Sequence, residues 1–173
     1  FKPHIKMKKI LSIVVLGLII TSNSMAYEEA NYKVVKKNKI YEIRKYSDRL
    51  AVETVISNEG SSFRKLFNYI SGNNEKNEEI KMTTPVTQIE KKGNITMQFY
   101  LPSRFNKDNA PSPSNSDVKI LNIKEGYYAV ITYSGRASDK NFIKHKSILE
   151  NELKKDNISI LSPPIKATYN NPF

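Results

Sequence analysis

Alternating apolar and polar positions predict β-strands along much of this chain. Residues 32–46 and 50–57 alternate in this way, are rich in Val, Ile and Tyr, and are separated by a turn at residues 47–49. Residues 81–91 and 94–101 form a second pair around a short Lys-Gly turn. Pro85 cannot donate a main-chain hydrogen bond, so an edge position or a bulge is expected there.

Between the two strand pairs the apolar period changes to that of a helix. Apolar side chains follow at i, i+3, i+4 and i+7, and these are Phe63, Leu66, Phe67 and Ile70. We therefore predict an amphipathic helix over residues 61–71, with Ser61 or Ser62 as its N-cap. The following Ser-Gly-Asn-Asn sequence supplies residues that tolerate left-handed backbone and ends the helix.

The same order of elements returns after residues 102–117, a stretch rich in Pro, Ser and Asn that predicts a surface loop. Ser138 is the predicted N-cap of the second helix, which continues to about Asp156. The predicted strands of this second part are residues 118–124, 127–134, 158–161 and 166–173.

Two copies of strand-strand-helix-strand-strand predict an α+β fold built from two pseudo-symmetric halves, about 32–101 and 118–173. Eight mostly antiparallel strands are expected to curl into a distorted barrel, with one helix from each half on the outside. The sequence therefore predicts a single domain over residues 27–173.

The segment before this domain has the features of a secretory signal peptide. In residues 7–26, two lysines precede a short apolar run, and small residues occupy the positions before a cleavage site after Ala26. The apolar run is shorter than the roughly 20 residues of a membrane-spanning helix, although a retained anchor is the alternative. Residues 1–6 precede Met7 and are interpreted as lying upstream of the native start. Export to the periplasm or the outside is expected.

Composition narrows the range of functions. Four of the 28 basic residues lie before residue 27, which leaves 24 basic and 17 acidic residues, a net charge of about +7 carried by scattered lysines. No nucleic-acid-binding module, phosphate loop or hydrolase motif is present. With no cysteine and His145 as the single histidine after residue 26, a metal site built by the chain alone is not expected.

Seven short motifs occur in order: YEIRKY at 41–46, YISGNN at 69–74, KMTTPV at 81–86, MQFYLP at 97–102, PSP at 111–113, YSG at 133–135 and YNNPF at 169–173. Together they cover nearly the whole domain, and the chain resembles the SOUL haem-binding family. The resemblance implies a distorted eight-stranded antiparallel barrel flanked by two helices. It also implies non-covalent binding of haem or another tetrapyrrole without catalysis, and we expect a monomer.

If haem binds, an apolar groove with a cation at its lip suits a porphyrin, which is a flat apolar disc with two carboxylates at one edge. The first helix is the best candidate wall, with Met82 facing the same cavity. The candidate ligand-binding residues are Phe63, Arg64, Lys65, Leu66, Phe67, Ile70 and Met82. The alternative is that the apolar stripe of this helix simply packs on the sheet.

Iron ligation by the chain is a separate question. His145 lies between Phe142 and Leu149 on the apolar side of the second helix, where a hydrogen-bonded packing role is expected rather than ligation. Tyr41, Tyr133 and Tyr169 are possible phenolate ligands, although tyrosine is also common in strands. Two other functions remain open: a protein- or lipid-interaction module of the same fold, and a tetrapyrrole-processing enzyme.

Overall fold

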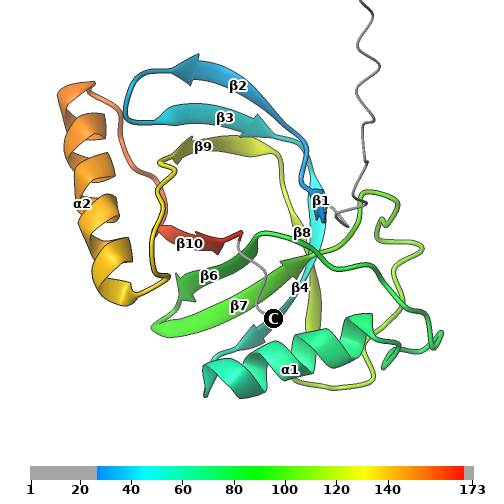
Figure 1. Ribbon diagram of the computed structural model, residues 1–173. Coiled ribbons are helices and arrows are strands. Elements are labelled where there is room, and N and C mark those ends of the chain that lie inside the picture. Colours follow the sequence, from blue (N-terminus) through cyan, green and yellow to red (C-terminus); the bar gives the residue numbers. More distant parts are fainter. Residues whose placement is uncertain (1–26, 170–173) are drawn as a thin grey trace, which may run out of the picture.

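The computed structural model describes residues 27–169, which fold into antiparallel sheets with a helix on each side (Figure 1). The helices are α1 (Glu59–Ile70) and α2 (Asp139–Lys155). The strands are β1 (Glu28–Glu29), β2 (Tyr32–Lys37), β3 (Glu42–Tyr46), β4 (Arg49–Val55), β5 (Thr83–Thr84), β6 (Val86–Lys91), β7 (Asn94–Tyr100), β8 (Lys119–Ile123), β9 (Gly126–Val130) and β10 (Ile165–Thr168).

One sheet has the order β10-β6-β7-β4-β8 and another the order β2-β3-β9, while β1 and β5 form a short parallel pair. The two larger sheets are joined by one bent two-stranded ribbon, in which β3 and β4 form one strand and β9 and β8 form the other. Arg49 of β4 lies opposite Ile123 of β8, and Tyr46 of β3 lies opposite Gly126 of β9, so the register passes unshifted across both bends. The predicted turn at residues 47–49 and the break between the predicted strands 118–124 and 127–134 are therefore bends in continuous strand pairs, and neither is a hairpin.

The predicted α+β class with two helices is confirmed. The strand ladders of the described residues form three open sheets, the smallest being the β1-β5 pair, so closure into an eight-stranded barrel stays a prediction. Three predicted strand features were wrong. Residues 32–46 form two strands because the Asn38 side chain accepts from the N–H groups of Ile40 and Tyr41 and turns the chain. Residues 158–161 are not a strand, and the predicted strand over residues 81–91 is interrupted at Pro85, which separates β5 from β6.

Both helices have an N-cap of the expected chemical type. The cap of α1 is Asn58, whose side chain accepts from Ser61 N at 3.1 Å, so the prediction of Ser61 or Ser62 was wrong by one turn. Ser62 is instead fully buried against the sheet. The prediction of Ser138 for α2 is confirmed, since its Oγ accepts from Asn141 N at 3.3 Å.

Removing the cap of α2 gives a small and measurable effect. Ser138→Ala should lower the free energy of unfolding by about 1 kcal/mol, because one main-chain N–H at the helix start loses its acceptor. Ser147→Ala, an exposed position in the middle of the same helix, is the matched control and should be neutral or slightly stabilising. Urea unfolding of both variants measures the difference, and equal losses would contradict the capping role.

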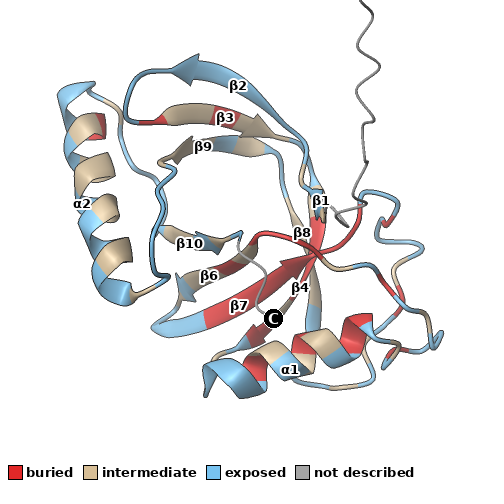
Figure 2. Ribbon diagram, in the orientation of Figure 1, coloured by how far each residue is buried: buried red, intermediate tan, exposed pale blue. Residues whose placement is uncertain are grey.

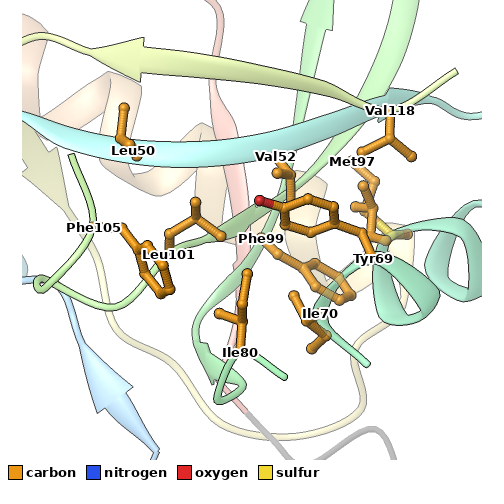
Figure 3. Packing of buried hydrophobic residues seen from close by; sticks show 11 residues of the cluster. Leu50, Val52, Tyr69, Ile70, Ile80, Met97, Phe99, Leu101, Phe105 and Val118 are labelled. Atoms are coloured by element: carbon orange, nitrogen blue, oxygen red, sulfur yellow. The ribbon is translucent and has the colours of Figure 1, made fainter. Parts of the chain in front are cut away.

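The hydrophobic core lies between α1 and the five-stranded sheet, where most of the buried residues gather (Figure 2). Tyr69, Ile70 and Ile80 meet Phe99 of β7 in this core (Figure 3). Residues 102–117 are not only a surface loop, because Phe105 joins the core and the carbonyl of Pro111 accepts from Tyr69 Oη at 2.8 Å. By contrast, Leu153 is the one residue of α2 that is buried.

Residues 1–26 and 170–173, including the predicted leader and the end of the last predicted strand, lie outside the described residues. Neither helix within residues 27–169 has the length and apolar character that crossing a bilayer requires.

Candidate functional site

A surface hollow of about 230 Å³ lies beside the C-terminal end of α1. One wall is the last turn of the helix, and the other is the segment that leads into β5. The residues that line it are Phe67, Ile70, Ser71, Glu79, Ile80 and Met82. The hollow is thus mainly apolar, with one carboxylate at its margin.

The wall opposite the helix is fixed by main-chain hydrogen bonds. Ile80 N donates to Ile70 O at 2.7 Å, and Ser71 forms an antiparallel bridge with Glu79. The turn between them needs Gly72, whose φ of +108° is a backbone conformation that side chains disfavour. Two segments ten residues apart therefore lie side by side and form the hollow.

The side chain of Asn74 holds this turn from inside. Its Nδ2 donates to Tyr69 O at 3.1 Å and to Glu78 O at 2.8 Å. Its Oδ1 accepts from Lys76 N at 3.2 Å and from Glu78 N at 3.1 Å. With 2% of its surface exposed, Asn74 links the end of the helix to the segment that carries Glu79 and Met82.

Aromatic rings connect the hollow to the core. The rings of Phe63 and Phe67 are nearly parallel, with centroids 6.1 Å apart, and Phe63 meets Phe99 edge-on at 5.1 Å. Phe63 and Phe67 are half-buried at the margin of the cluster. Phe67 is thereby held in place while part of its ring stays accessible.

The structure brings three of the seven residues predicted from the sequence to the hollow, and these are Phe67, Ile70 and Met82. Leu66 is 0% exposed, and its side chain belongs to the core behind the hollow. Phe63 packs beside Phe67 without lining the hollow. Ser71, Glu79 and Ile80 were not among the sequence candidates, because only the pairing of residues 79–80 with 70–71 brings them there.

The two predicted cations lie on different flanks of α1. Arg64 is exposed and shares a helix face with Phe67 and Ser71, at i, i+3 and i+7. Lys65 lies over the other flank, where its Nζ is 2.8 Å from Asp117 Oδ2. This ion pair lowers the pKa of the Asp117 carboxyl. Of the two, Arg64 is placed to meet a ligand in the hollow.

His145 lies on α2, at the opposite side of the molecule from α1 (Figure 1). Its Nδ1 is 2.9 Å from the carbonyl oxygen of Asn141, and its ring stacks on Tyr133 with centroids 4.0 Å apart. Since a carbonyl oxygen only accepts, Nδ1 carries the proton of this hydrogen bond. The contacts are those of a packing residue.

The other tyrosines considered as iron ligands have perturbed phenols. A hydrogen bond donated to Asp156 raises the pKa of Tyr41 to about 12, and partial desolvation raises the pKa of Tyr169, which stays 43% exposed, to about 12. Both side chains are therefore protonated near neutral pH. Within residues 27–169 there is also no group of three His, Asp or Glu side chains close enough to hold a metal ion.

Comparison with known proteins agrees with the resemblance seen in the motifs. The sequence profile of the family described as SOUL heme-binding protein matches residues 27–173. Heme-binding protein 2 of Mus musculus is 31% identical over 179 residues, which span 91% of this chain and 85% of the mouse protein. Heme-binding protein 2 of Homo sapiens is 36% identical over 111 residues, which span 57% of this chain and 54% of the human protein. The chain belongs to the SOUL haem-binding family.

Proposed function

We propose that this protein binds haem or a related tetrapyrrole non-covalently, with the hollow beside α1 as the binding site. The observation that carries the proposal is the accessible apolar surface of Phe67 and Met82 at one hollow, beside the buried Ile70, in a chain of a haem-binding family. Two relatives whose names record haem binding support the same ligand.

The size of the hollow determines how such a ligand would bind. At about 230 Å³ it is smaller than the roughly 300–1,000 Å³ of typical small-molecule sites. A porphyrin would therefore be enclosed along one edge, with the rest of the disc against the exposed side of α1. Contact area would supply the affinity, and reversible binding follows from a site that leaves much of the ligand in water.

Charge around the hollow orients the ligand. Glu79 lines the hollow, and the last turn of α1 ends without a basic residue, so this end is unfavourable for carboxylates. Arg64, one turn before Phe67, is the cation on the same face. We therefore expect the propionates to point along the helix toward Arg64 and away from Glu79.

A pair of neighbouring substitutions tests this orientation. Arg64→Gln should weaken hemin binding about two- to fivefold, as is usual for an exposed ion pair. Lys65→Gln should leave the hemin Kd unchanged, because Lys65 faces Asp117 on the other flank. Hemin titrations at low and at physiological salt measure both values. Equal effects of the two variants would mean that Arg64 does not bind the propionates of hemin.

A carrier or scavenger role is the proposed use of this binding. The leader predicted over residues 7–26 would export the protein to the periplasm or outside. A site that binds haem reversibly, without a bond from a side chain to the iron, suits ligand delivery there. We propose that the exported protein acts as a monomer. The family and relative names describe binding rather than catalysis, and a tetrapyrrole-processing activity would show as altered haem after incubation with a reductant.

Titrating the purified protein with hemin tests the proposal directly. We expect a saturable shift of the Soret band at micromolar hemin, at one site per chain. Absence of a saturable shift would favour the second candidate, a protein- or lipid-interaction module of the same fold. That candidate is supported by β2, which is exposed along its whole length and presents Val34 and Val35 to solvent.

A further inference from the structure

Arg49 lies at the start of β4, next to the bend that joins the two sheets, and is surrounded by aromatic rings. Its guanidinium carbon is 4.6 Å from the ring centroid of Tyr46, 5.1 Å from that of Tyr100 and 5.3 Å from that of Tyr128. Such contacts stabilise a cation, but they do not use its hydrogen-bond donors. Most of the donors of Arg49 therefore remain to be accounted for.

Nε of Arg49 is shielded from solvent and has no hydrogen-bond partner in the described part of the chain. One terminal nitrogen donates to Ser47 O over 3.4 Å, and within residues 27–169 no carboxylate forms an ion pair with this arginine. Arg44 on the adjoining strand shows the usual arrangement, since its Nε is 2.9 Å from Glu42 Oε2. A buried donor on a charged group without an acceptor is costly.

The carboxylate next to Arg49 in the sequence, that of Asp48, makes its hydrogen bonds to other residues. Its Oδ1 accepts from Glu125 N at 2.7 Å, and its Oδ2 meets Asn122 and Lys124 at the bend between β8 and β9. These contacts lower the pKa of Asp48. Asp48 thus binds the segment between β8 and β9, and Arg49 is left without a counter-ion.

Arg49 lines a cavity of about 260 Å³, the volume of roughly nine water molecules in the liquid. The cavity has an apolar part formed by Leu50, Leu101 and Phe105, and a polar part that includes Thr83 and Tyr100. It shares no lining residue with the hollow beside α1. A guanidinium without a counter-ion lies beside apolar side chains here, and the carboxylates of Glu28, Glu29 and Asp48 also line the cavity, so the arrangement suits a small amphipathic anion of low charge.

We infer that this cavity binds a small organic monocarboxylate, with its carboxylate on Arg49 and its apolar body against Leu101 and Phe105. A dianion such as phosphate is disfavoured, because Arg49 is the only basic side chain within residues 27–169 that lines the cavity, and Glu28, Glu29 and Asp48 also line it. The site is separate from the proposed haem site. It is a second binding function of the same domain.

Benzoate is a suitable probe, and benzamide is its neutral control of nearly the same shape. We expect benzoate to bind saturably and to shift the Nε–H resonance of Arg49 in a nitrogen–proton NMR spectrum. Benzamide and inorganic phosphate should produce no such shift. A benzoate titration that leaves this resonance in place, or an equal response to benzamide, would overturn the inference. This measurement on the unaltered protein does not depend on any variant folding.

Arg49→Gln should weaken benzoate binding tenfold or more, since a charge-assisted hydrogen bond is lost. Arg104→Gln is the matched control, because Arg104 also lies against an aromatic ring, that of Phe105, but is exposed and paired with Glu78. It should bind benzoate like the unaltered protein. Unchanged benzoate affinity in a folded Arg49→Gln variant would contradict the site.

Discussion

Replacing Phe67 with aspartate should weaken hemin binding by at least tenfold. The substitution removes the aromatic wall of the hollow and places a charge where a porphyrin would lie. Burying a side chain of this size is worth about 1.5–3 kcal/mol, and the new carboxylate adds a desolvation cost and repels the propionates. A Soret titration of each protein gives the two Kd values directly.

The control for this variant is His145→Ala, which should bind hemin within about twofold of the unaltered protein. His145 packs on Tyr133 and lies on α2, away from the hollow. Equal loss in Phe67→Asp and His145→Ala would show that the binding site is placed wrongly. If Phe67→Asp does not fold, Met82→Gln tests the same hollow from its other wall, because Met82 is half-buried and its flexible side chain tolerates substitution.

The parts of the fold that the sequence predicted are those with local causes. The stripe of Phe63, Leu66, Phe67 and Ile70 predicted α1, and Ser138 predicted the start of α2, because periodicity and capping act within a few residues. The alternation of residues 94–101 likewise predicted β7. Each of these signals is complete within one segment of the chain.

The features that the sequence did not predict depend on contacts between distant segments. Nothing near residues 47–48 shows that β3 and β4 continue through a bend, because the reason is their shared partner ribbon some 75 residues later. The ion pair of Lys65 with Asp117 and the burial of Leu66 also separate residues of α1 that the sequence analysis grouped in one candidate site. The stripe locates a face but does not say which of its residues stay accessible.

The hollow beside α1 combines both kinds of information. The helix stripe located Phe67 and Ile70, and the motif after the turn located Met82. What joins them is the segment of residues 71–80, in which the sequence analysis identified only the Ser-Gly-Asn-Asn end of the helix. Asn74 is the residue of that turn whose side chain makes the joining contacts, so it links stability to the proposed site.

Asn74→Ala should therefore lower the free energy of unfolding by about 3 kcal/mol, a large share of the usual 5–15 kcal/mol. The variant loses four hydrogen bonds and leaves the carbonyl groups of Tyr69 and Glu78 without these donors. Water can replace part of the loss at the exposed side of the turn, which keeps the expected value below the sum of four separate bonds.

The matched control is Asn73→Ala, since Asn73 is exposed and its main chain, rather than its side chain, makes the hydrogen bonds that hold it. Urea unfolding should separate the two variants by more than 2 kcal/mol, and similar values would contradict the role given to Asn74. Hemin affinity provides the second measurement. At a temperature where Asn74→Ala is still folded, its hemin Kd should rise, because Ile80 and Met82 are no longer held against α1.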